Sequence, residues 1–117
     1  MVSQLRIYVI NRGMMVSWLK LFEEHIRPLS GKLGMPVESA WVNIEDAARP
    51  GHPRVPLAEQ TEFLWVRSFE SAEEIPEKEA AYFASPECKA LGDLPLNHVA
   101  KSEVRVIEPV PTAEPVS

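Results

Sequence analysis

The sequence predicts an α+β fold, a four-stranded antiparallel sheet with helices on one face. Two observations lead to this prediction. Four segments have the alternating apolar residues of strands, and helical segments lie between the first and second and between the third and fourth of them. A chain of 117 residues with 45% apolar content is long enough for one core but too short for two. We therefore expect one domain over residues 1–108.

The first third of the chain predicts a strand, a helix and a second strand. Residues 5–10 alternate and end in the turn sequence Asn11-Arg12-Gly13. From residue 14 to about 27, apolar residues recur at helical spacing. They are Met15, Trp18, Leu19, Phe22, Ile26 and, just beyond, Leu29. Pro28 lacks a backbone N–H, so we expect the helix to kink or end there. The second strand is expected over 37–44.

The middle of the chain predicts a long loop and then the third strand. Residues 45–60, EDAARPGHPRVPLAEQ, contain three prolines and no apolar period, so they predict a loop longer than a hairpin needs. Residues 61–69, TEFLWVRSF, alternate as a strand does. One face would carry Phe63, Trp65, Arg67 and Phe69, and the other Glu62, Leu64, Val66 and Ser68.

The last third predicts two helical segments and the fourth strand. A helix begins either after Ser71, which would cap it together with Glu74 in a capping box, or near Pro76, and it ends near Ala84. Ser85-Pro86 starts a shorter helix through Leu91. A loop over 92–97 leads to a strand over 98–107. Three prolines and no apolar pattern predict that the tail 109–117 is disordered.

The order of elements, βαββαβ, is that of a ferredoxin-like fold. Both helices then lie on one face of the sheet, and the apolar residues of the other face, such as Leu64 and Val66, are left uncovered. An apolar patch of that size is unusual on a monomer. We expect a second copy of the sheet to cover it, which gives a homodimer of the dimeric α+β barrel type.

Composition excludes several classes of partner. A net charge of −5 and a pI near 5.2 argue against nucleic acid and anionic membrane surfaces. No leader pattern and no run of about 18 apolar residues is present, so we expect no membrane association and a cytoplasmic location. The single cysteine, Cys88, cannot form an internal disulfide.

Short motifs spread over roughly residues 4–110 resemble the NIPSNAP family. They are Leu5-Arg6-Ile7-Tyr8 with Gly13, Leu21-Phe22-Glu23-Glu24 with Pro28, Leu64-Trp65 ahead of Phe69-Glu70-Ser71, and Ser102-Glu103 with Pro109. The resemblance implies a dimeric α+β barrel, a fold shared with antibiotic-biosynthesis monooxygenases. It implies no single reaction, because that fold hosts several. The loop over 45–60 looks longer than is usual in the family.

Four residues of the first and third strands are candidates for a binding site. Arg6 and Tyr8 share one side of the first strand, and Trp65 and Arg67 share one side of the third, which is its neighbour in a ferredoxin-like sheet. Together they suit a planar anion with an apolar body. The alternative is that the arginines pair with Glu62, Glu38 or Glu103 across the sheet. Trp41 and Asn43 of the second strand are candidates to extend the pocket.

His25 is the candidate general base, with Tyr8 as the other. The spacing of His25 from Trp18 and Phe22 places it on or beside the buried stripe of the first helix. There it either acts on a substrate or bonds a backbone carbonyl. His52 and His98 are expected to be solvated. Histidine and cysteine spacing predicts no metal site, and we expect no cofactor; haem would need a histidine over the pocket.

Two functional hypotheses remain open. The first is a homodimeric protein that binds a small hydrophobic or aromatic acid and, if it is an enzyme, performs cofactor-independent proton abstraction, isomerisation or oxygenation. His25 or Tyr8 would be the base, and Arg6 and Arg67 would stabilise negative charge. The second is a non-enzymatic scaffold that acts through its dimer surface and the loop 45–60. A cavity beside these residues favours the first; a filled core with paired arginines favours the second.

Overall fold

The computed structural model describes residues 1–44 and 55–111. The strands are β1 (Val2–Ile10), β2 (Val37–Val42), β3 (Glu62–Phe69) and β4 (Val99–Ile107). One long helical rod comprises α1 (Met15–Leu21), the π-helical segment η1 (Phe22–Ile26) and α2 (Arg27–Lys32). The others are the 3₁₀ turn η2 (Leu57–Glu59), α3 (Glu74–Ala84), α4 (Pro86–Leu91) and α5 (Leu94–His98).

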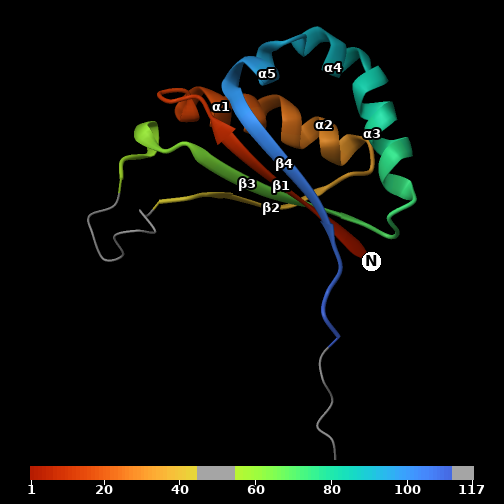
Figure 1. Ribbon diagram of the computed structural model, residues 1–117. Helices are drawn as coiled ribbons and strands as arrows, with labels where there is room; N and C mark the ends of the chain where they lie inside the picture. The colour runs from red at the N-terminus through yellow and green to blue at the C-terminus, as the bar shows by residue number, and fades with distance from the viewer. Residues whose placement is uncertain (45–54, 112–117) are drawn as a thin grey trace, which may run out of the picture.

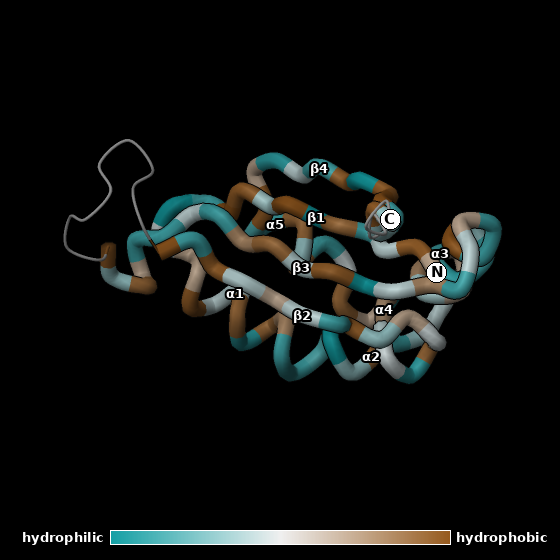
Figure 2. The backbone as a smooth tube through the Cα atoms, turned by 90° about the horizontal axis from the view of Figure 1, so that it is seen from below, coloured by the Kyte–Doolittle hydropathy of each residue, from teal (hydrophilic) through white to brown (hydrophobic). Residues whose placement is uncertain are grey.

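The four strands form one antiparallel sheet in the order β2-β3-β1-β4, which is the ferredoxin-like order predicted from the sequence. Figure 1 shows that all the α-helices lie on one side of this sheet, with α3, α4 and α5 arching over β4. Figure 2, seen from the other side, shows the sheet with no helix in front of it. The predicted α+β fold with helices on one face is therefore confirmed.

Strand register divides the sheet into a covered face, which the helices overlie, and an open face. Arg6 lies opposite Trp65, and Tyr8 opposite Phe63, so these side chains share the covered face. On this face an aromatic cluster forms the core, in which Phe22 lies 4.9 Å from Phe63 and 5.2 Å from Trp65 between ring centroids. The open face carries Leu5, Ile7, Val9, Trp41, Leu64 and Val66.

Of the two outcomes predicted at Pro28, a kink or an end, the helix does not end there but continues to Lys32. The π-helical segment ends at Ile26, two residues before this proline, and the N–H of Arg27 donates to Phe22 O, five residues back. A π-turn changes the hydrogen-bond pattern locally, so a residue without an N–H fits where a regular α-helix would be broken.

The region after α4 also differs from the prediction. Residues 92–97 were expected to be a loop, but Leu94–His98 form α5, with Pro95 in its first turn. His98, expected to be solvated at the start of the last strand, closes α5 and is only 3% exposed. By contrast, α4 spans the predicted residues, and the Ser85 side chain accepts from Cys88 N–H as its N-cap.

Candidate functional site

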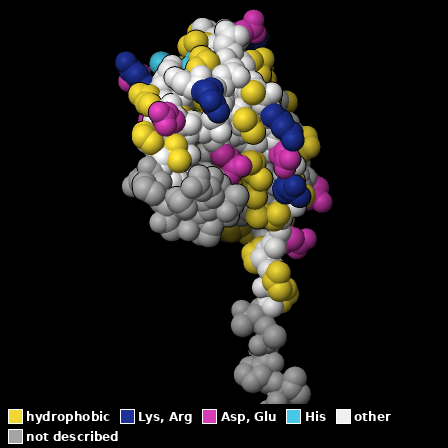
Figure 3. All heavy atoms as spheres, turned by 60° about the vertical axis from the view of Figure 1, so that its left-hand side comes forward, with side chains coloured by type: hydrophobic (Ala, Val, Ile, Leu, Met, Phe, Trp, Pro, Cys, Tyr) yellow, Lys and Arg dark blue, Asp and Glu magenta, His cyan; other side chains and the backbone are white. Residues whose placement is uncertain are grey.

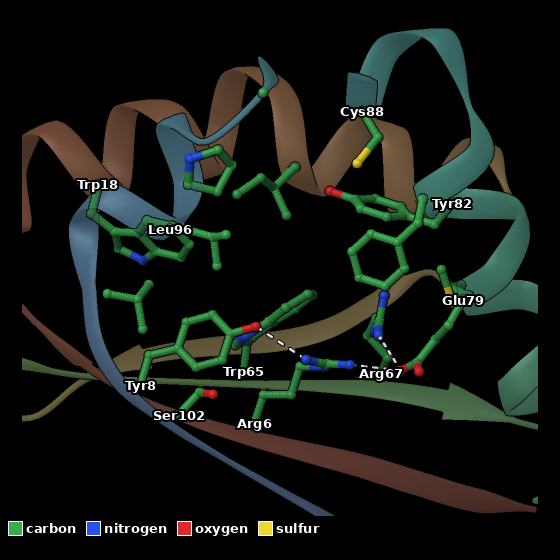
Figure 4. Close-up of a pocket in the computed structure, with 16 residues that line it drawn as sticks. Arg6, Tyr8, Trp18, Trp65, Arg67, Glu79, Tyr82, Cys88, Leu96 and Ser102 are labelled. Atoms are coloured by element: carbon green, nitrogen blue, oxygen red, sulfur yellow. Dashed lines mark hydrogen bonds and ion pairs between the residues drawn. The ribbon is translucent and has the colours of Figure 1, made fainter. Parts of the chain in front are cut away.

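A cavity of about 330 Å³ lies between the covered face of the sheet and the helices, within a single chain. Its floor comes from β1 and β3, with Arg6, Tyr8, Trp65 and Arg67 (Figure 4). Trp18 and Leu96 line one side, and Tyr82 and Glu79 of α3 line the other. Phe83 of α3 also lines the cavity. The volume is at the small end of the roughly 300 to 1,000 Å³ that ligand pockets span, which suits a small molecule.

The four candidates from the first and third strands meet here, as the alternation of the strands predicted. Trp41 and Asn43 do not join them. Trp41 lies opposite Leu64, on the open face, and is 63% exposed. Asn43 follows β2, where its backbone N–H donates to Glu62 O at 3.1 Å, and it does not line the cavity.

Two buried side chains, Gln4 and Arg67, and two half-buried ones, Arg6 and Glu79, form an ion cluster at the floor of the cavity. Glu79 Oε1 accepts from Arg6 Nη2 at 2.6 Å and from Arg67 Nη2 at 3.2 Å. Gln4 holds both arginines, because its Oε1 accepts from Arg6 Nε and from Arg67 Nη2. With two arginines and one glutamate, the cluster has a net charge of +1. The expected alternative partners, Glu38, Glu62 and Glu103, do not bond these arginines.

The two arginines are in different electrostatic positions. Burial, and the repulsion from Arg6, lower the pKa of Arg67 to about 10. For Arg6, burial lowers the pKa, but Tyr8 and Glu79 raise it by more, so the net shift is upward. Both remain charged at neutral pH, and the guanidinium of Arg67 lies 4.8 Å from the Trp65 ring centroid, a cation–π contact. The floor therefore carries unbalanced positive charge beneath an apolar space.

Tyr8 and Arg6 retain hydrogen-bonding capacity toward the cavity. The Tyr8 hydroxyl accepts from Arg6 Nη1 at 3.2 Å and donates to no acceptor within residues 1–44 and 55–111. Arg6 uses three N–H groups, on Gln4, Tyr8 and Glu79, and a guanidinium has more than three. These remaining donors can bind an oxyanion.

The opposite side of the cavity carries two protonated side chains. Burial, with a further contribution from Cys88, raises the pKa of Tyr82 to about 12. Burial also raises the pKa of the Cys88 thiol. Both groups are therefore uncharged at neutral pH, and Cys88 lacks the thiolate character of a nucleophile.

His25 was expected beside the buried stripe, and this expectation is wrong. It is exposed and lines a different hollow between α2 and α4. The cause is the π-helical segment, which spans His25. A π-turn contains more residues than an α-turn, so it keeps Ile26 in line with Phe22 and turns His25 toward solvent.

His98 was likewise misplaced by the sequence argument. Its Nδ1 lies 2.8 Å from Leu94 O, which can only accept, so Nδ1 carries the proton. Nε2 then accepts from the Ser17 hydroxyl at 2.8 Å. Both ring nitrogens are thus used: Nδ1 bonds within α5, and Nε2 joins α5 to α1. Neither His25 nor His98 lines the cavity, so neither can be a haem ligand there.

Other sequence expectations concern partners. In the described part of the chain, no three His, Cys, Asp or Glu side chains are grouped to hold a metal ion. None of the helices in residues 1–44 and 55–111 is long and apolar enough to cross a membrane. The side of the molecule seen in Figure 3 mixes charges of both signs with apolar side chains. Of the loop 45–60, residues 45–54, including His52, lie outside the described residues, as do 112–117 of the tail.

Solved structures with this arrangement include NIPSNAP proteins. An uncharacterized NIPSNAP domain protein from Burkholderia xenovorans has a TM-score of 0.77 at 12% identity, over 98% of this chain and 100% of that one. A NIPSNAP family protein from Agrobacterium tumefaciens has a TM-score of 0.74 at 21% identity, over 96% and 95%. The chain has a NIPSNAP-type fold. The resemblance seen in the sequence motifs is confirmed at the level of the fold.

More distant solved structures also share this fold. An antibiotic biosynthesis monooxygenase has a TM-score of 0.58 at 14% identity, over 95% of this chain and 100% of that one. No protein-family model matches the sequence, and no curated protein does. At these identities the comparisons establish the fold alone, so function has to be argued from the site.

Sequence reasoning missed Glu79, the counter-ion of both arginines. Nothing in the spacing of α3 identifies it, since the sequence around it, EKEAAYF, carries several acidic and polar residues. Which acidic residue of α3 pairs with the arginines depends on how this helix lies over β1. The sequence did indicate that an acidic partner is needed, because Arg6 and Arg67 were predicted to lie side by side and buried charges are normally paired.

Proposed function

We propose that the protein binds a small hydrophobic or aromatic acid in the cavity of each chain. The observation that carries this proposal is the joint presence of Arg6 and Tyr8, with spare donors, on the floor of an apolar cavity. The positive charge of the ion cluster favours an anionic head group, and the pKa of Arg67, lowered by burial, indicates that an added anion would be stabilised. Phe83 and Leu96, which are 63% and 71% exposed at the rim, suit the apolar part of the ligand.

Binding of substituted benzoates, measured by calorimetry, tests this proposal. Replacing Arg6 with Ala should weaken binding by about 1.5 to 3 kcal/mol, because a charge-assisted hydrogen bond is lost. Arg105→Ala is the matched control, since Arg105 lies opposite Leu5 on the open face. Equal affinity for the wild-type protein and Arg6→Ala would exclude an anion site at Arg6.

A catalytic function is the second candidate, and the Tyr8 hydroxyl favours it. The hydroxyl accepts a hydrogen bond from Arg6, and no described residue accepts its proton. A group that gives or takes a proton in a reaction must be free to bond the substrate in this way. Cofactor-independent proton abstraction, isomerisation or oxygenation of an acidic aromatic substrate is the class we propose, with Arg6 and Arg67 stabilising negative charge. A solved antibiotic biosynthesis monooxygenase has a similar fold, and oxygenation is one of these reactions.

Tyr8→Phe separates catalysis from binding. Products formed from a panel of phenolic acids would be followed by mass spectrometry, and affinity by calorimetry. If Tyr8 transfers a proton, the variant binds but forms no product. A variant that forms product at the wild-type rate would rule out Tyr8 in this role.

We also propose that the functional unit is a homodimer, in which the open faces of two sheets pack together. The six apolar residues of the open face support this, as does the exposure of Trp41, which a monomer would leave in water. Because the cavity lies on the covered face, binding by each chain does not require the dimer. The scaffold alternative depends on the loop 45–60, of which only residues 55–60 are described, and it stays a prediction.

A further inference from the structure

Glu79 has one carboxylate oxygen that is fully used and one that is not. Oε1 accepts three hydrogen bonds, from Gln4 Nε2 at 2.7 Å, Arg6 Nη2 at 2.6 Å and Arg67 Nη2 at 3.2 Å. Oε2 accepts from none of the described residues. Glu79 reaches from α3 to the two arginines at the edge of the cavity that it helps to line (Figure 4).

The three bonds fix the orientation of this carboxylate. Its two oxygens cannot exchange places without breaking these bonds. Gln4 in turn holds both arginines. Although burial raises the pKa of Glu79, hydrogen bonds from Gln4 and Arg6 lower it by more, to below the ordinary value of 4.5. The group is therefore ionised at neutral pH. Its Oε2 is a negatively charged acceptor that no hydrogen bond from the described residues uses.

The charge of the ion cluster limits what can bind beside this acceptor. Two arginines and one glutamate leave a single positive charge, which one monoanionic head group neutralises. A second carboxylate in the ligand would bring two negative charges together in a partly buried site, where like charges repel strongly. A hydroxyl in the same place would instead donate to Glu79 Oε2.

We propose that Glu79 selects the ligand: the cavity accepts an acid that has one negative charge, bound by Arg6 and Tyr8, and a second group that donates a hydrogen bond to Glu79 Oε2. This inference rests on the proposed binding function and names the class of ligand within it. Aromatic hydroxy acids have both features. Dicarboxylic acids of the same shape are excluded.

Three probes of one shape test the selection: benzoate, 3-hydroxybenzoate and isophthalate. They differ only in the group at the meta position, which is hydrogen, hydroxyl or carboxylate. A meta hydroxyl cannot close an internal hydrogen bond with its own carboxylate. For the wild-type protein, 3-hydroxybenzoate should bind about tenfold more tightly than benzoate, because it gains a hydrogen bond to a charged acceptor, and isophthalate should bind most weakly.

Glu79→Gln should reverse this order. The side chain introduced has the same shape as glutamate, and its carbonyl oxygen can keep the three bonds that now reach Oε1. The other oxygen becomes an NH₂ donor, and the cluster gains one positive charge. We expect the advantage of the hydroxyl to disappear and isophthalate to become the tightest of the three probes.

Glu77→Gln is the matched control, because Glu77 is exposed on the same helix and should keep the wild-type order. If Glu79→Gln does not fold, as thermal unfolding would show, Glu79→Asp replaces it. Aspartate keeps the charge but is shorter, so the hydroxyl advantage should fall while isophthalate stays the weakest ligand. An unchanged order of the three probes in Glu79→Gln, or an unchanged hydroxyl advantage in Glu79→Asp, would overturn the assignment of Glu79 and leave the proposed function intact. Failure of all three probes to bind the wild-type protein would overturn both.

Discussion

The two faces of β3 have different surroundings. On the covered face, Phe63, Trp65 and Arg67 are 1%, 4% and 3% exposed, and they touch helices, aromatic rings and the ion cluster. On the open face, Leu64 and Val66 are only partly buried, and nothing in the described chain lies over them. The cavity is therefore complete within one chain, whereas none of the described residues covers the open face.

This difference concerns two predictions made from the sequence. The pocket was predicted from Trp65 and Arg67 with residues of the first strand, and the homodimer from the opposite face of the same strand, which carries Leu64 and Val66. In the structure the cavity lies under the helices, away from the open face. Ligand binding and assembly can therefore be tested one at a time.

The largest expected effect compares neighbouring residues on the two faces. Phe63→Ala should lower the free energy of unfolding by about 3 to 5 kcal/mol, because it empties the centre of the aromatic core. Leu64→Ala should cost about 1 kcal/mol in dilute protein, as expected for a half-buried side chain. Urea unfolding measures both. Equal losses would show that the open face is as fully packed as the core.

The second prediction concerns assembly through the open face. Trp41→Asp should weaken the dimer by about 2 to 4 kcal/mol, because a large aromatic side chain at an interface is replaced by a charge. Sedimentation at a series of concentrations measures the dissociation constant. Thr61→Asp, next to β3 but not among the residues of the open face, is the control. A wild-type protein that is monomeric at micromolar concentration would exclude the dimer.

The third and smallest expected effect is a difference in coupling energy between an ion pair on the covered face and one on the open face. Arg6 and Glu79 are mostly buried, and a double-mutant cycle on unfolding should give a coupling of about 2 kcal/mol. Arg105 and Glu103 form an exposed pair on the open face, so their coupling should be below about 1 kcal/mol. Similar couplings for the two pairs would mean that the cavity floor is as well solvated as the surface.

The sequence was sufficient for the order of elements and for one side of the site. Alternation along a strand fixes which residues share a face, so Arg6 with Tyr8 and Trp65 with Arg67 could be grouped before the structure was known. The glycine expected in the turn after the first strand also fits, since Gly13 has φ of +83°, a conformation that favours glycine.

The sequence was insufficient wherever the periodicity of an element changes or one element must be placed over another. The π-helical segment moved His25 out of the core. In β2, a register shift between Val37 and Ser39 changes which residues face the helices, and Trp41 lies on the open face. Glu79 and His98 depend on the placement of α3 and α5, which only tertiary packing decides.

The three tryptophans provide the most direct test of the central claim, that ligand binds on the covered face and a second chain packs on the open one. Trp18 and Trp65 line the cavity, and Trp41 lies on the open face. Their indole N–H signals would be followed by NMR in ¹⁵N-labelled protein during titration with 3-hydroxybenzoate, and then on dilution. We predict that the ligand shifts the signals of Trp18 and Trp65 and that dilution shifts that of Trp41. A ligand that shifts Trp41 alone, or no tryptophan, would contradict the account.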